Sequence, residues 1–323
     1  MADPRTLEAV ESSDTDTLLR IIDGLCRAQA WDSLTEIRQL CADAQTRGKQ
    51  LWGVDEHIRY RLALEAPAAL AAAAVIEGPA RFSLGPLTEV VASRHSFAEL
   101  EPHLPPGPPR AWIAHERVLR GEVINAELDA AVVELPLLLA DWEPDYPPVA
   151  YHPDRVEAEP PGLPPLQPLP PAGRGEAVDD PATIDALAAL VAAWVEESNG
   201  RVATVCATGG LAAALRLLGV PEPAAARIDL ATALALMAWA GASGGAHGRR
   251  RGGAAGRLAA WWVLHQVTGS SWPPSPPDLG RMGAELEWYA WSDRGGNPGW
   301  NLQLAVTSPG ESLTWVVSAN DAA

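Results

Sequence analysis

The first third of the chain repeats apolar residues at helical spacing. The clearest set is Leu18, Ile21, Ile22 and Leu25. Because residues three or four apart share one side of a helix, this spacing predicts an amphipathic helix. The same pattern returns at 34–41 and 58–64, and further helices are expected at 68–76 and 111–119. Successive helices with no strand pattern between them predict an all-α helical stack over residues 1–125.

The last third changes from helical spacing to strict alternation. Apolar and polar residues alternate through 300–307 and again through 312–318, with the segment SPGE at 308–311 between them. Alternation of period two is typical of strands that have one buried face. Proline followed by glycine at the centre of the connection predicts a type II turn. Residues 286–290 supply a third antiparallel strand.

Helices and one further strand are predicted earlier in the same domain. An amphipathic helix is expected from about residue 179 to Ser198, and RVATVCA at 201–207 is typical of a buried strand. The apolar helices expected between 229 and 267 can cover the sheet. Residues 179–323 are therefore predicted to form an α+β domain, with a small antiparallel sheet packed on helices. The whole chain is of mixed class, because this domain follows an all-α helical stack.

Proline marks the middle of the chain. Twelve prolines lie between Pro136 and Pro171, and the middle third of the chain, residues 101–200, carries −13 of the net charge of −17. Proline fixes φ and removes a hydrogen-bond donor, so such a stretch favours extended backbone over helix or central strand. We expect residues 126–178 to be an acidic connector between two domains. It could be a semi-rigid linker, a strap over a domain surface, or a ligand for a proline-recognising domain.

Charge and composition exclude several classes of protein. The chain has 41 acidic and 24 basic side chains, for a formal net charge of −17. Binding to phosphate backbones depends mainly on clustered Lys and Arg, so a nucleic-acid partner is not expected. No apolar run approaches the ~20 residues of a membrane span, and the N-terminus lacks a signal-peptide pattern. Three cysteines do not suggest a disulfide framework, so we expect a cytoplasmic protein that does not engage membranes.

Tryptophan is concentrated near the C-terminus, where eight of the thirteen lie in the last 85 residues. Such a cluster can fill a core between a sheet and its helices, or form a surface that stacks on sugars or peptides. The alternation places Trp288, Trp300 and Trp315 on inward faces. Trp291 falls on the opposite face, so it is expected to be exposed.

No recognised catalytic or metal-binding motif is convincing. GASGG at 241–245 matches the nucleophile elbow G-x-S-x-G, which would make Ser243 the nucleophile. That motif requires a strand before it, whereas the preceding residues predict a helix. The seven histidines are scattered, and no paired C-x-x-C is present. We therefore predict no catalytic residue, no metal site and no cofactor.

The Gly/Arg-rich segment 244–257 is the remaining candidate for ligand binding. The expected anion-contacting residues are Arg249, Arg250 and Arg251, with His247 and Arg257 as secondary contacts. Glycines let a ligand approach the backbone, and arginines at the start of a helix suit a phosphate or carboxylate. A structural interpretation is also open. Glycines at 248, 252 and 256 could form a flat strip for helix packing, with the arginines paired to acids of the same chain.

Three segments also carry a family resemblance. EESNGR at 196–201, MAWAGASGGAHGRRRGGAAGR at 237–257 and the Trp-rich C-terminal hairpin resemble a family of actinobacterial proteins of unknown function. This resemblance implies no activity and assigns no site residue. From the residues themselves we expect a binding or adaptor protein with a protein partner, because a helical stack offers extended surface. The alternative is an enzyme that holds a small anionic substrate at 244–257.

Overall fold

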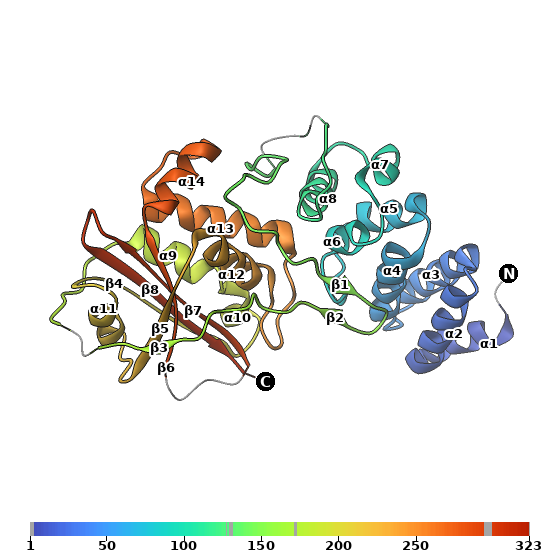
Figure 1. Cartoon of the computed structure of the whole chain (residues 1–323). Coiled ribbons are helices and arrows are strands. Elements are labelled where there is room, and N and C mark those ends of the chain that lie inside the picture. Colours follow the sequence, from blue (N-terminus) through green and yellow to red (C-terminus); the bar gives the residue numbers. More distant parts are fainter. Residues whose placement is uncertain (1–2, 127, 129–131, 171–172, 294–298, 323) are drawn as a thin grey trace. The chain divides into compact units, whose positions relative to one another are not determined.

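The computed structural model describes residues 3–126, 128, 132–170, 173–293 and 299–322. The chain divides into two compact units (Figure 1). The helical unit comprises Met1–Arg117, Ile124–Val132 and Val149–Glu157. The sheet unit comprises Val118–Val123, Val133–Pro148 and Ala158–Ala323. The mixed class expected from the sequence is confirmed, since helices dominate the first unit and an antiparallel sheet packs on helices in the second.

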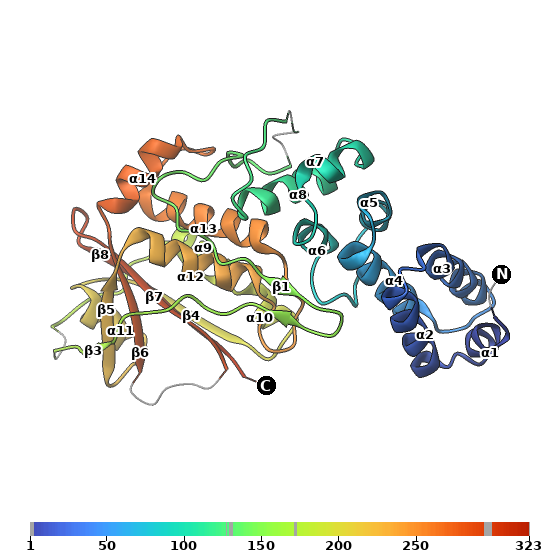
Figure 2. The same cartoon turned by 45° about the vertical axis from the view of Figure 1, so that its right-hand side comes forward.

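Antiparallel helix pairs and shorter helices build the helical unit (Figure 2). Its elements are α1 (Pro4–Ser12), α2 (Thr15–Arg27), α3 (Trp31–Thr46), α4 (Trp52–Glu65), α5 (Ala68–Ile76), α6 (Leu87–Ala92), α7 (Phe97–Leu100), the 3₁₀ turn η1 (Glu101–His103), α8 (Pro108–Val118) and a hairpin of β1 (Ala150–Tyr151) and β2 (Val156–Glu157). Leu18 and Ile22 of α2 pack with Leu34 and Ile37 of α3 in one core. The apolar spacing in the sequence therefore marks the buried helix faces.

The sheet unit contains a six-stranded antiparallel sheet in the order β3-β5-β6-β7-β8-β4. Its strands are β3 (Gln167–Pro168), β4 (Arg201–Thr208), β5 (Pro223–Ile228), β6 (Glu287–Asp293), β7 (Trp300–Ser308) and β8 (Leu313–Asp321). Its helices are α9 (Pro181–Ala189), α10 (Ala192–Glu196), α11 (Leu211–Leu217), α12 (Leu230–Ala242), α13 (Gly253–Thr268) and α14 (Pro276–Ala284). The predicted three-stranded meander is β6-β7-β8, which forms the centre of this larger sheet.

Helices cover parts of both faces of the sheet (Figure 1). Helix α12 packs on β6 and β7, and α9 packs on β4 and β8. On the opposite face, α11 covers a second apolar cluster that includes Trp291. The expectation that Trp291 is exposed was wrong, because this helix leaves its side chain only 3% accessible. Alternation correctly placed Trp291 on the other face but could not show that a helix covers it.

Two local predictions were also wrong. The helix expected from 179 to Ser198 is divided into α9 and α10, because the N–H of Val191 bonds to Ala188, three residues back. The turn between β7 and β8 is not type II. Gly310 does not adopt the positive φ that its position in such a turn requires, whereas Ser312 does, at +56°.

The proline-rich middle of the chain is shared between the two units. Residues 150–157 form the β1–β2 hairpin of the helical unit, whereas Val133–Pro148 belong to the sheet unit. Further along, β3 pairs with β5, and Ala177 forms an isolated bridge with Ala207 of β4. Pro171 lies outside the described residues. Within the described part of the chain, no helix has both the length and the apolar character needed to cross a membrane.

Candidate functional site

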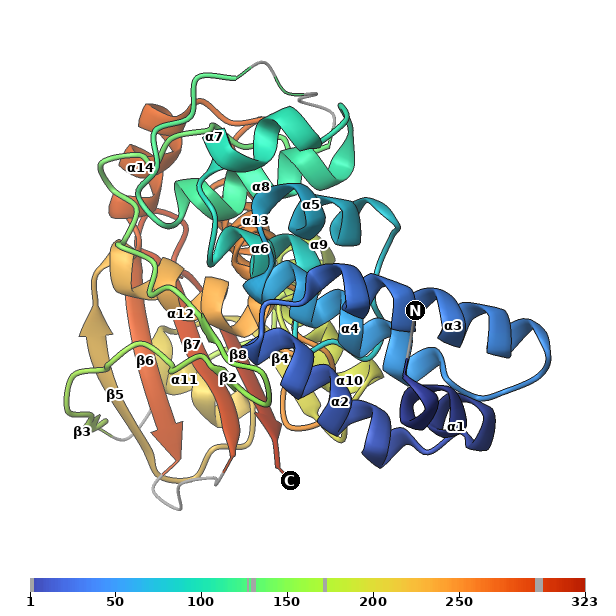
Figure 3. The ribbon, with the colours of Figure 1, turned by 90° about the vertical axis from the view of Figure 1, so that its right-hand side faces the viewer.

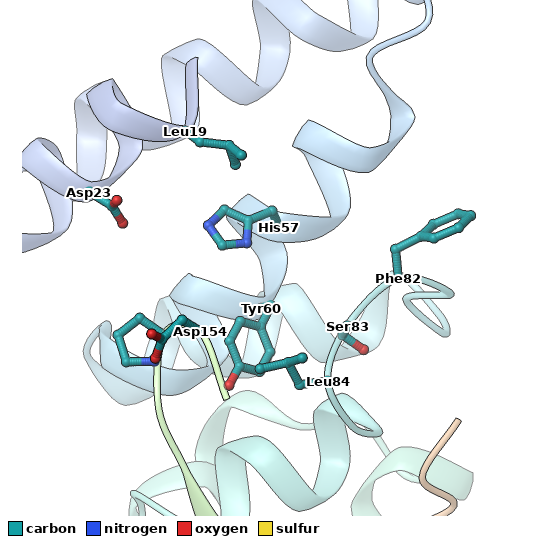
Figure 4. Close-up of a pocket in the computed structure, with 9 residues that line it drawn as sticks. Leu19, Asp23, His57, Tyr60, Phe82, Ser83, Leu84 and Asp154 are labelled. Carbon is teal, nitrogen blue, oxygen red and sulfur yellow. The ribbon is translucent and has the colours of Figure 1, made fainter. Parts of the chain in front are cut away.

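The helical unit contains a cavity of about 540 Å³. Four separate segments contribute its walls, as Figure 4 shows. The lining residues are Leu19, Asp23, His57, Tyr60, Phe82, Ser83, Leu84, Pro153 and Asp154. This volume lies in the range that small ligands or single side chains of a partner occupy.

Helix spacing directs two pairs of side chains into the cavity. Leu19 and Asp23 are four residues apart on α2, and His57 and Tyr60 are three apart on α4. Residues at these spacings share one side of a helix. The hydroxyl of Tyr60 donates a hydrogen bond to the carbonyl of His152, which fixes the ring against the β1–β2 turn. Figure 3 looks onto α2 and α4, the two helices that supply these pairs.

The segment between α5 and α6 forms another wall. The hydroxyl of Ser83 donates to the carbonyls of Ala80 and Gly85, at 2.9 and 2.6 Å. A Cβ at Gly85 would lie 2.0 Å from the hydroxyl of Tyr151, so glycine is needed for this close approach. The Tyr151 hydroxyl itself donates to the buried carboxylate of Glu89, at 2.6 Å. Packing and hydrogen bonds therefore hold this wall in place.

The central ring groups of the cavity are neutral at physiological pH. Burial lowers the pKa of His57, and the positive charge of Arg61 lowers it further. Burial is also the main cause that raises the pKa of Tyr60 well above its ordinary value. The half-buried imidazole of His57 can therefore offer a hydrogen bond to a ligand without adding charge, whereas the ring of Tyr60 is only 1% accessible and forms part of the wall.

Carboxylates at two edges of the cavity carry its charge. Asp23 pairs with the guanidinium of Arg61, and Glu65 binds the same guanidinium, with 2.8 Å between its Oε1 and Nε of Arg61. At the hairpin turn, Asp154 lies 3.5 Å from Nη1 of Arg155. Glu157 again shares that guanidinium, at 2.9 Å from its Nε. Two carboxylates thus share one guanidinium at each edge.

An exposed aromatic pair adjoins the cavity. Phe82 lines it with a side chain that is 60% exposed, and its ring centroid lies 4.4 Å from that of Trp52, which is 50% exposed. The N–H of Phe82 donates to the carboxylate of Glu56 on α4, which helps to hold the ring in position. Large exposed aromatic side chains beside a pocket are typical of the anchors at protein interfaces.

The predicted anion-contacting residues lie elsewhere, in the loop between α12 and α13 of the sheet unit. Arg249 and Arg251 both face Glu197, with nitrogen–oxygen distances of 3.8 Å. The N–H of exposed His247 donates to the hydroxyl of Ser198. Arg250 precedes Arg251 in the same loop and is half-buried. The loop thus brings residues 247–251 together at the end of α10.

Arg257 is separated from this group. It lies in α13 and, like its partner Glu143, has a side chain with 0% exposure. Nε and Nη2 of Arg257 each donate to Glu143 at 2.7 Å, and Nη1 and Nη2 donate to the carbonyls of Pro136 and Leu138 at 3.0 Å. The indole of Trp261 donates to the same carboxylate at 2.9 Å. Arg257 therefore binds residues 133–148 to α13 within the sheet unit.

The glycine strip is only partly formed. Helix α13 begins at Gly253, with Gly252 as its N-cap at φ +102°. Gly248 lies in the preceding loop, where it packs against Gly244 and α10. Gly256 alone of the three lies within the helix, and it faces α12 at close range.

The other candidate chemistry also has a structural position. Ser243 is the buried C-cap of α12, and its hydroxyl accepts a hydrogen bond from the indole of Trp194 at 2.8 Å. A helix precedes it, as the sequence predicts, so the elbow geometry is not present at this serine. The described residues contain no group of three or more His, Cys, Asp or Glu side chains arranged to hold a metal ion.

The chain matches one protein family, and that family has no assigned activity. The family described as "Family of unknown function (DUF6183)" matches residues 16–323. The chain belongs to this family. No curated protein and no solved structure shows significant similarity to it. The match extends over both units, so the cavity and the arginine loop lie within the region that defines the family.

The cavity has no local signature in the sequence. Its residues are spread from Leu19 to Asp154, so no local motif joins them. One signal was present, since His57 and Tyr60 are three residues apart and therefore share one side of α4. The positions of the hairpin turn and of Phe82 depend on tertiary packing, which periodicity does not describe.

Proposed function

We propose that this protein is a binding protein whose helical unit docks a protein partner at the cavity. The observation that carries this proposal is the combination of a cavity with an exposed aromatic pair at its edge. An aromatic anchor next to a pocket can bury much apolar surface with little loss of side-chain entropy. The polar edges formed by Asp23 and Asp154 would surround that apolar contact, as in known interfaces.

The test compares partner capture by matched surface variants. Phe82→Ser removes the most exposed aromatic side chain at the cavity, and Leu217→Ser removes a 45% exposed leucine from the sheet unit. Both residues are exposed, so both variants should keep the melting temperature of the wild type. Tagged wild type and Leu217→Ser should recover the same stoichiometric protein from the native host. Phe82→Ser should lose most of it.

Two results would contradict the proposal. The docking surface lies elsewhere if Phe82→Ser retains the partner and Leu217→Ser loses it. The protein is not an adaptor of this kind if the wild type carries a small molecule and no stoichiometric protein. That second result would favour the enzyme alternative, with an anionic substrate at Arg249, Arg250 and Arg251.

A further inference from the structure

The charged groups that line the cavity are all acidic. Among its lining residues, Asp23 and Asp154 carry charge, and neither lysine nor arginine is present. They come from different segments, α2 and the β1–β2 turn, and stand at separate edges (Figure 4). A ligand that fits this cavity therefore meets negative charge at its edges and neutral side chains within.

On the basis of the proposed function, we infer that the cavity receives an arginine side chain of the protein partner. The inner walls suit the apolar stem of arginine, because Leu19, Leu84 and Pro153 present hydrocarbon surface. The exposed ring of Phe82 offers a face on which a planar guanidinium can stack. The ring of Tyr60 is only 1% accessible and forms part of the wall. The imidazole of His57 adds a neutral hydrogen-bonding group to the lining.

The edges of the cavity keep an excess of negative charge despite their ion pairs. Arg61 balances one of the two carboxylates of Asp23 and Glu65, and Arg155 balances one of those of Asp154 and Glu157. These ion-paired groups leave one negative charge at each edge, and Arg94 is a further positive charge that acts on Tyr60. A guanidinium has five donors in a fixed plane, so it can bind a carboxylate at one edge while its flat face contacts the exposed ring of Phe82.

The chemistry favours arginine over other cations. A lysine ammonium is strongly hydrated and has no planar face, so it would gain less from the exposed ring of Phe82. An anionic group would be repelled at both edges. Because acidic side chains outnumber basic ones in the whole chain, the long-range field also attracts a basic partner.

Calorimetric titration of the full chain with three blocked pentapeptides tests the inference. The probes are acetyl-Gly-Leu-Xaa-Leu-Gly-amide with Xaa as arginine, lysine or citrulline. Citrulline keeps the shape of arginine without its charge. The arginine peptide should bind about tenfold more tightly than the citrulline peptide and several-fold more tightly than the lysine peptide.

Variants show whether that preference comes from the cavity. Asp154→Asn removes one edge charge from a side chain that is 79% exposed, so folding should not change. It should weaken the binding of the arginine peptide several-fold and leave the affinity of the citrulline peptide unchanged. Glu8→Gln removes one charge from the exposed surface of α1, outside the cavity, and should leave all three affinities unchanged.

The outcomes separate this inference from the proposed function. If all three peptides bind equally and Phe82→Ser weakens each of them, the cavity binds partners but does not select arginine. That result overturns the inference and leaves the proposed function standing. If Phe82→Ser changes no affinity, the peptides bind elsewhere and the arginine inference fails, while the capture experiment decides the proposed function. If no peptide binds, the arginine inference is wrong, and the capture experiment alone decides the proposed function.

Discussion

At the residue scale, the buried arginines of the two units have partners that differ in their exposure to solvent. Arg257 and Glu143 are both fully buried and bind each other through two hydrogen bonds. Arg61 is also buried, but its partners Asp23 and Glu65 reach solvent to different degrees. The first pair is part of a core, whereas the second connects a core to the edge of the cavity. The effect of replacing Arg257 should therefore differ from the effect of replacing Arg61.

Glu143→Gln should be among the most damaging single substitutions in the sheet unit. Burial by itself raises the pKa of Glu143, but the hydrogen bonds and charge of Arg257 outweigh it and leave that pKa below its ordinary value. Removing the carboxylate charge leaves a buried guanidinium without its counterion, at a cost of about 3–5 kcal/mol. Urea unfolding measures this loss. Glu285→Gln, which breaks the exposed pair with Arg281, is the control and should cost far less.

The pH dependence of stability should depend in part on His57. Burial first, and the charge of Arg61 second, lower the pKa of His57 in the folded chain. The unfolded chain therefore binds the proton more readily, with its histidine pKa at about 6.5. The contribution of His57 is complete above that pH and is lost as the pH falls through the lower, folded pKa.

Thermal unfolding at pH 7.5 and pH 5.5 checks this sign. His57→Gln should lose less stability than the wild type on this acid step, because one histidine no longer titrates. His103→Gln, at an exposed position of η1, is the control. An equal acid sensitivity in the wild type and His57→Gln would show that other groups, such as His265 with its similarly lowered pKa, dominate.

At the element scale, two glycines in helices have opposite roles. A Cβ at Gly256 of α13 would lie 2.1 Å from the carbonyl oxygen of Ala238 and 2.9 Å from the backbone nitrogen of Ala242. Nothing lies within 4 Å of the corresponding position at Gly24 of α2. Gly256 therefore lets α12 and α13 approach each other closely, whereas Gly24 only gives the unfolded chain more freedom.

Alanine substitutions should reveal this difference in sign. Gly256→Ala should reduce the free energy of unfolding by about 1–3 kcal/mol, because backbone atoms of α12 block the added methyl group. Gly24→Ala should raise it by up to about 1 kcal/mol, the usual gain in helix propensity. Chemical denaturation of both variants measures the two changes. A stabilised Gly256→Ala variant would mean that α12 and α13 pack less tightly than described.

Periodicity predicted elements better than it predicted their surroundings. The helices at 15–27 and 52–65 and the hairpin of β7 and β8 follow from local spacing alone. By contrast, β5 has the sequence PAAARI, whose alanines carry little strand signal. The burial of Trp291 depends on a helix about eighty residues earlier, which alternation does not reveal.

The candidate site was also harder to predict from the sequence, because it too depends on tertiary packing. The cavity joins four segments through tertiary packing, and its residues are ordinary when taken singly. The arginine segment stood out because its charge is local in sequence. The structure separates Arg257 from the other four residues by placing it in a core, since a buried glutamate 114 positions earlier matches it. Anion contact by Arg249, Arg250, Arg251 and His247 stays a prediction.

At the scale of the whole molecule, the first proteolytic cut should fall between 158 and 166. These residues have neither helix nor strand, and most of their side chains are exposed. The next residues are protected, because β3 pairs with β5. Brief digestion with subtilisin followed by mass spectrometry locates the cut. Earlier cleavage within the β1–β2 hairpin, or resistance of the whole stretch, would contradict this expectation.

The two fragments of nicked protein should remain together. The N-terminal fragment keeps residues 133–148, which belong to the sheet unit and are bound there through Glu143. Gel filtration should show a single peak with the size of the intact chain, and denaturant should divide it into two. In the nicked Glu143→Gln variant the fragments should separate more readily, because the buried ion pair no longer joins them.

The position of Glu143 in the sequence also determines how long it must remain unpaired while the chain is translated. Glu143 and Trp142 leave the ribosome well before their partners, since Arg257 is 114 residues further along. At 5–20 residues per second, the segment waits about 6–23 s for the helix that will bury it. Throughout that interval an apolar indole and an acidic side chain remain in solvent on the nascent chain. The sheet unit therefore cannot finish folding until Arg257 has been synthesised, so the speed of the ribosome limits when this unit first becomes native.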